Sequence, residues 1–154
     1  MTDAPKTVAT RSIVVEWQLG YPMHKVWRAI TDSALIARWL MDNDFEPVVG
    51  HHFHFRAQPV PGWDGVVHCE VYEVDVPKKL VYSWAGGADN KTGYGSRLDT
   101  LVSWTLTQTA DGGTHVRLVH SGFTDKDSFA FETMGKGWRG KIAEQLANVV
   151  ASLT

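Results

Sequence analysis

The spacing of apolar residues changes once along the chain, and this change limits the possible folds more than any other feature. Up to about residue 122, most segments alternate between apolar and other side chains, a pattern typical of β-strands. Near the C-terminus the apolar residues instead recur at helical spacing, at Trp138, Ile142, Leu146, Val149 or Val150, and Leu153. A sheet with one apolar face needs a cover, and only this helix is long enough. The sequence therefore predicts an antiparallel sheet packed against a C-terminal helix.

One strand and two short helices are predicted at the start of the chain. Residues 13–19 alternate as expected for a half-buried strand. Pro22 suits the first position of a helix, where its missing N–H needs no partner, and apolar residues then follow at helical spacing over residues 23–30. Residues 31–33 offer capping side chains for a second helix that reaches Leu40.

Five more strands are predicted between residues 48 and 122. Their alternation slips near Val71, which predicts a β-bulge, and Asp111-Gly112-Gly113 indicates a hairpin turn. The glycine-rich segment 86–99 is predicted to be a polar loop, and residues 86–97 within it a mobile loop that could gate the mouth of a cavity. Gly140 and two nearby glycines predict a close approach or a bend in the terminal helix. The five segments are residues 48–56, 66–76, 80–84, 100–109 and 114–122.

The fold class predicted is therefore α+β: a curved antiparallel sheet of about six strands wrapped around a long C-terminal helix, with two short helices after the first strand. The 154 residues fit one domain over residues 1–154, with residues 1–10 expected to be flexible. A formal charge of −2 argues against nucleic-acid binding. Without a signal peptide or membrane span, a cytoplasmic monomer or homodimer is expected.

Several local motifs resemble, in order, those of one known family. They begin with the two helices and the glycine–aromatic strand of Gly50, Phe53 and Phe55, although His51 and His52 stand where that family more often has small or acidic residues. They continue with a proline-to-aromatic strand and three closing motifs. The chain resembles the START-like or Bet v 1-like superfamily and, within it, the activator of Hsp90 ATPase homologue family. The matching residues are Pro22 with 26–31, 37–40, Gly50, Phe53, Phe55, Pro77, Leu80, Tyr82, Trp84, Gly113, Thr114, 120–123, Gly137, Trp138 and Leu146.

The resemblance implies a helix-grip fold, in which a curved sheet holds the terminal helix around an internal cavity. It implies binding of a small hydrophobic or aromatic ligand, with the ligand itself unidentified. One alternative is an enzyme of the polyketide cyclase type acting in the same cavity. Another is a chaperone-associated, Hsp90-type protein of the stress response. Fold alone does not choose among these functions.

Nine residues are predicted to bind the ligand, because their positions in the alternating or helical patterns turn them inward. Either a ligand cavity or a fully packed aromatic core accounts for so many large rings. His120 and Tyr82 are also candidates for a catalytic acid or base, although a buried histidine held by hydrogen bonds explains His120 as well. The nine residues are Trp17, Trp39, Phe53, Phe55, Tyr82, Trp84, Trp104, His120 and Trp138.

Neither a metal site nor a cofactor is predicted. His52 and His54 share one face of a strand while His51 points to the other, and no third ligand can be located for a metal. Cys69, the single cysteine, lies within an apolar strand and is expected to be an inert buried thiol. No phosphate-binding loop, dinucleotide motif or nucleophile motif is present in the sequence, so no convincing catalytic constellation emerges.

Overall fold

A computed structural model describes residues 10–91 and 93–153. Residues 1–10 were expected to be flexible, and of these only Thr10 belongs to the described residues. In chain order the elements are β1 (Arg11–Leu19), α1 (Met23–Thr31), α2 (Ser33–Trp39), β2 (Asp42–Asn43), β3 (His52–Arg56), β4 (Val66–Asp75), β5 (Lys79–Gly86), η1 (Gly93–Gly95), β6 (Leu98–Gln108), β7 (Thr114–Phe123), η2 (Asp125–Asp127), α3 (Ser128–Arg139) and α4 (Lys141–Ser152).

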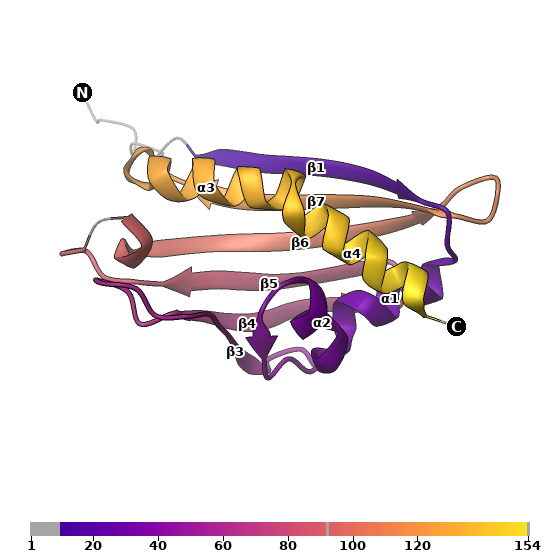
Figure 1. The fold of residues 1–154 in the computed structure, drawn as a ribbon, viewed down its shortest axis with the longest axis horizontal. Helices are drawn as coiled ribbons and strands as arrows, with labels where there is room; N and C mark the ends of the chain where they lie inside the picture. Colours follow the sequence, from indigo (N-terminus) through magenta and orange to yellow (C-terminus); the bar gives the residue numbers. More distant parts are fainter. Residues whose placement is uncertain (1–9, 92, 154) are drawn as a thin grey trace, which may run out of the picture.

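The strands of the described chain form one curved antiparallel sheet in the order β1-β7-β6-β5-β4-β3-β2 (Figure 1). Seven strands are present instead of about six, because the two-residue strand β2 carries no detectable alternation. The predicted bulge is confirmed, since the pairing of β4 with β5 shifts between Val71 and Glu73. Strand β3 begins at His52, four residues later than the alternation suggested, because Gly50 adopts a φ of +89° and a turn precedes the strand.

The helical layer covers the inner face of this sheet (Figure 1). The long C-terminal helix is bent: α3 ends at Arg139 and α4 starts at Lys141, with Gly140 between them. A Cβ atom at Gly140 would lie 2.9 Å from the carbonyl oxygen of Lys136, which explains the glycine at the bend. No described helix is long and apolar enough to cross a membrane.

The two short helices are confirmed, with one small correction. Pro22 is the N-cap residue of α1 and so precedes its first turn. Asp32 caps α2 as expected, because its Oδ1 accepts hydrogen bonds from the backbone N–H groups of Ala34 at 3.0 Å and Leu35 at 3.3 Å. This cap separates α1 from α2 and allows Trp39 to turn into the core.

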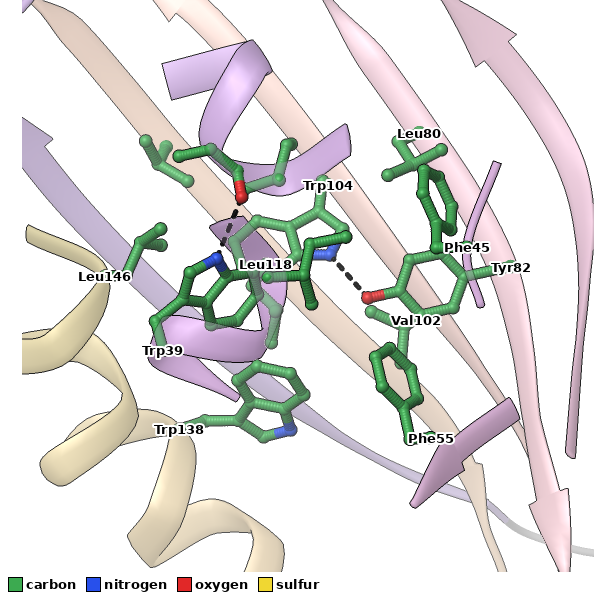
Figure 2. Close-up of a cluster of buried hydrophobic side chains, with 14 of the residues drawn as sticks. Trp39, Phe45, Phe55, Leu80, Tyr82, Val102, Trp104, Leu118, Trp138 and Leu146 are labelled. Atoms are coloured by element: carbon green, nitrogen blue, oxygen red, sulfur yellow. Dashed lines mark hydrogen bonds between the residues drawn. The ribbon is translucent and has the colours of Figure 1, made fainter. Parts of the chain in front are cut away.

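Aromatic rings fill the centre of the space between sheet and helices (Figure 2). The Trp104 ring lies 5.6 Å from that of Trp39 and 5.9 Å from that of Trp138, and all three residues are at most 1% exposed. Each of their indole N–H groups has a partner: Trp39 donates to the Ala29 carbonyl, Trp104 to the Tyr82 hydroxyl and Trp138 to His120. These large rings are buried without leaving an unsatisfied polar atom, because each indole N–H is hydrogen-bonded.

Candidate functional site

A pocket of about 140 Å³ lies at the end of the sheet where β5 finishes. Its walls come from the start of β4, the end of β5, the η1 segment and one side of α3. Aromatic, aliphatic and methionine side chains make up most of its surface. The lining residues are Met41, Trp63, Val66, Val67, Trp84, Ala85, Gly86, Gly87, Gly93, Tyr94, Ser96, Leu98, Phe129, Ala130, Thr133 and Met134.

Three aromatic rings from separate segments line the outer part of the pocket. The ring of Tyr94 stacks on Trp63 at 6.1 Å and meets Phe129 edge-on at 5.1 Å. Tyr94 is 56% exposed and Phe129 is 46% exposed, so both rings reach from solvent to the pocket. Sequence reasoning missed these residues because they lie in a turn, in a glycine-rich loop and at the start of a helix. The sequence signal that could have identified them is the presence of aromatic residues inside otherwise polar segments.

Glycines hold the loops around this pocket together. A Cβ atom at Gly95 would lie 1.9 Å from the carbonyl oxygen of Gly62, and one at Gly87 would lie 2.2 Å from that of Ser96. The loop between β3 and β4 and the loop between β5 and β6 therefore touch backbone to backbone. This contact positions Trp63 beside Tyr94. Mobility of the glycine-rich loop stays a prediction.

The nine predicted ligand-binding residues all lie in one continuous cluster of rings. From Trp104 the contacts run through Trp138 to Trp84 at 5.9 and 6.0 Å, and from Trp84 to Phe55 at 5.1 Å. Only Trp84 among the nine also lines the pocket. The other eight pack against one another beneath the helices: Trp17, Trp39, Phe53, Phe55, Tyr82, Trp104, His120 and Trp138. Their binding of a ligand stays a prediction.

His120 is fully buried at the centre of a hydrogen-bond chain. An indole nitrogen can only donate, so Trp138 Nε1–H donates to His120 Nδ1 at 3.1 Å. His120 Nε2 must then carry the proton and donate to Thr100 Oγ1 at 2.8 Å, and Thr100 donates to the Trp84 carbonyl oxygen at 2.7 Å. Burial lowers the pKa of His120 to about 3, so the ring is neutral and both nitrogens are occupied.

Tyr82, the other acid–base candidate, is also enclosed by the core. Its hydroxyl accepts the indole N–H of Trp104 at 3.1 Å (Figure 2). Burial raises the pKa of Tyr82 far above its usual value, and the hydrogen bond from Trp104 offsets this only in part. Neither His120 nor Tyr82 lines the pocket, so neither is placed to exchange a proton with a molecule bound there.

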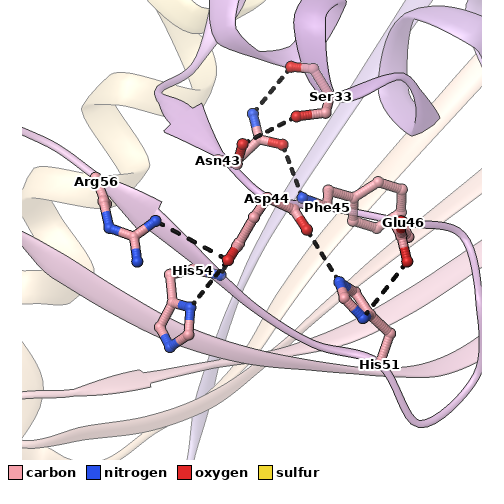
Figure 3. A network of polar contacts seen from close by, with 8 residues as sticks. All are labelled: Ser33, Asn43, Asp44, Phe45, Glu46, His51, His54 and Arg56. Carbon is pink, nitrogen blue, oxygen red and sulfur yellow. Dashed lines mark hydrogen bonds and ion pairs between the residues drawn. The ribbon is translucent and has the colours of Figure 1, made fainter.

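Two of the three neighbouring histidines, His51 and His54, join a polar network around Asp44 at the edge of the sheet (Figure 3). Asp44 accepts the backbone N–H of His54, and its Oδ2 lies 3.4 Å from His54 Nδ1. Partial burial raises the pKa of Asp44, but these contacts with His54 outweigh it and leave the pKa below its ordinary value. His51 Nε2 contacts the Asp44 carbonyl oxygen, while His52 Nε2 faces Glu70 at 3.6 Å.

These histidines therefore have separate carboxylate or carbonyl partners. Across residues 10–91 and 93–153, no group of three or more histidine, cysteine or acidic side chains is arranged to hold a metal ion. Cys69 is a buried free cysteine in β4, and burial raises the pKa of its thiol well above the usual range. A thiol held in this protonated form is a poor nucleophile.

Together, the curved sheet, the two helices after β1 and the bent terminal helix define a helix-grip protein with a pocket at one end of the grip. The chain belongs to the family described as activator of Hsp90 ATPase homolog 1-like protein, whose model matches residues 20–151. This confirms the resemblance found in the sequence. No curated protein sequence matches the chain significantly.

Solved structures support the same assignment. Protein MLL2253 from Mesorhizobium loti is 38% identical, with a TM-score of 0.82 over 94% of this chain and 99% of that one. Protein BH1534 from Bacillus halodurans is 30% identical, with a TM-score of 0.69 over 91% and 96%. CalU16 from Micromonospora echinospora is 22% identical, with a TM-score of 0.69 over 93% and 78%, and shows a likeness of fold.

Proposed function

We propose that this protein binds a small apolar molecule in the pocket between β5, η1 and α3, as a carrier or sensor in the cytoplasm. The observation that carries the proposal is the pocket itself, with a volume of about 140 Å³ and a predominantly apolar lining. An apolar cavity of about 150 Å³ in another protein binds benzene, so the volume suits a ligand of about one ring. Membership in a helix-grip family supports a binding role.

The chemistry of the lining favours binding over catalysis. Among the described lining residues there is no aspartate, glutamate, histidine, lysine, arginine or cysteine. General acid–base catalysis of the polyketide cyclase type would need an acid or base within hydrogen-bond reach of the substrate, and the phenol of Tyr94 is the one ionisable side chain in the described lining, with no second such group beside it. Contact with an Hsp90-type chaperone is suggested by the family's description alone and is not part of the proposal.

Toluene titration followed by NMR tests this function. Toluene should shift the methyl signals of Met41 and Met134, which line the pocket, in a saturable way. The substitution Ala130→Leu places a larger side chain in the pocket wall. This substitution should weaken toluene binding by about tenfold or more, because the leucine side chain and toluene together would overpack the pocket at a cost of about 1–3 kcal/mol.

Ala151→Leu is the matched control, since Ala151 lies exposed on α4, away from the pocket. This variant should bind toluene as the unchanged protein does. A protein whose Met41 and Met134 signals do not move at any toluene concentration lacks the proposed site. Equal binding by the Ala130→Leu variant would place the ligand elsewhere.

A further inference from the structure

Trp84 differs in its hydrogen bonding from the three tryptophans that are at most 1% exposed. Trp39, Trp104 and Trp138 each donate their indole N–H to a protein acceptor. Trp84 is only 3% exposed, yet its Nε1–H has no hydrogen-bond partner among the residues that the structure describes. An indole N–H buried without a partner would cost about 1–3 kcal/mol, so its surroundings need an explanation.

The pocket supplies that explanation. Among the described residues, no wholly enclosed side-chain nitrogen or oxygen lacks a hydrogen-bond partner. Trp84 Nε1 therefore keeps some accessible surface, and Trp84 is one of the residues that line the pocket. The indole ring is fixed by its packing against Phe55 at 5.1 Å and Trp138 at 6.0 Å. An indole N–H that meets the pocket here is a donor held in place at a mostly apolar wall.

We propose that Trp84 Nε1–H anchors the ligand by donating a hydrogen bond to it, so that the pocket selects an uncharged apolar molecule bearing a carbonyl-type acceptor. This inference rests on the proposed function of the pocket. A purely hydrocarbon ligand would displace water from the indole N–H and leave it unsatisfied, which reduces the gain from apolar contact. A carbonyl oxygen at the same position replaces that water. The lining offers no cation to compensate a charged ligand, which restricts the class to neutral molecules.

Two probes of nearly equal shape test this preference. Acetophenone carries a carbonyl oxygen where α-methylstyrene carries a methylene group, and both have the same number of non-hydrogen atoms. The unchanged protein should bind acetophenone about tenfold more tightly, as expected for one additional satisfied hydrogen bond. In the Trp84→Phe variant this preference should disappear while α-methylstyrene still binds.

Two further variants serve as comparisons. Trp27→Phe makes the same substitution in α1, outside the pocket, and should retain the preference. Thr133→Val removes a hydroxyl from the α3 wall. Loss of the preference in Thr133→Val, or its persistence in Trp84→Phe, would overturn the assignment of the anchor to Trp84.

An NMR measurement on the unchanged protein covers the case in which Trp84→Phe does not fold. Acetophenone should move the indole proton signal of Trp84 downfield, and α-methylstyrene should not. If both probes bind equally tightly and that proton responds to neither, the anchor is refuted while the pocket function stands. If neither probe binds, the proposed function itself fails and the anchor fails with it.

Discussion

A histidine on an otherwise apolar strand face can be a reactive group or a structural one, and at His120 the burial and the hydrogen bonds favour the structural role. Its two nitrogens are committed to Trp138 and Thr100, so that one side chain links α3, β7 and β6. The sequence placed His120 on the inner face correctly through alternation. The hydrogen-bond partners of His120 could not be predicted from the sequence, because Trp138 lies in another element and Thr100 precedes the region of clearest alternation in its strand.

The buried neutral state of His120 predicts a specific pH dependence of stability. The folded-state pKa of about 3 lies below the unfolded value of about 6.5, so between these pH values only the unfolded chain gains a proton. The contribution of neutral His120 to the free energy of unfolding is therefore intact above about pH 6.5. Below that pH it is lost by up to about 1.4 kcal/mol per pH unit. Urea unfolding at several pH values between about 4.5 and 6.5 measures this slope.

His120→Gln provides the comparison, because its amide offers an acceptor and a donor but does not titrate in this range. The variant should be less stable at neutral pH and show a slope smaller by about 1 kcal/mol per pH unit. The six other histidines are present in both proteins and cancel in the difference. Parallel pH profiles for the two proteins would contradict a neutral, buried His120.

At the scale of elements, the pocket depends on two loops crossing at Gly95. Because a Cβ atom there would meet the Gly62 carbonyl oxygen at 1.9 Å, Gly95→Ala should force the loops apart and lower the free energy of unfolding by about 1–3 kcal/mol. It should also weaken toluene binding, since Trp63 and Tyr94 would move relative to each other. Urea unfolding and the toluene titration measure the two effects.

Gly20→Ala is a suitable control, because a Cβ atom at Gly20 would have no neighbour within 4 Å. Its stability should stay within about 0.5 kcal/mol of the unchanged protein. If Gly95→Ala were equally well tolerated, the backbone contact between the loops would not be what holds the pocket walls in place.

The elements with regular hydrophobic spacing could be predicted from the sequence, and those built by distant contacts could not. Alternation correctly identified β1 and the inward direction of Trp84. The bend lies at one of the three glycines for which a close approach or a bend was expected. Alternation misled at residues 48–51, which form a turn before the strand: the N–H of His51 bonds to the carbonyl of Val48 at 3.0 Å, although Gly50 and His51 already bond to the backbone of Val71. The pocket was missed because its loops meet only in three dimensions.

For the whole molecule, the rings at the centre and the pocket at one end have different physical roles. The central rings are enclosed and hydrogen-bonded, which makes the middle of the grip a packed core. The segment α3 lies at the pocket end of the sheet, and after the bend at Gly140 the segment α4 covers a different part of the fold (Figure 1). The segment α3 lines the pocket, whereas α4 packs against α1 and α2.

This division predicts that α4 carries a large share of the global stability. Three residues of α4 and the C-cap residue Leu153 are buried on one apolar stripe: Leu146, Val149, Val150 and Leu153. At about 1.5–3 kcal/mol for each side chain, their burial contributes roughly 6–12 kcal/mol, comparable to the entire stability of a typical domain. A chain ending at Gly140 should therefore lose its cooperative thermal transition, measured by near-ultraviolet circular dichroism of the tryptophans. Glu144→Ala, on the exposed side of α4, should change stability by less than about 0.5 kcal/mol. A sharp transition in the shortened chain would instead mean that the sheet and α3 form a self-sufficient core, because the loss of α4 would then leave the packing of Trp104 and Trp138 intact.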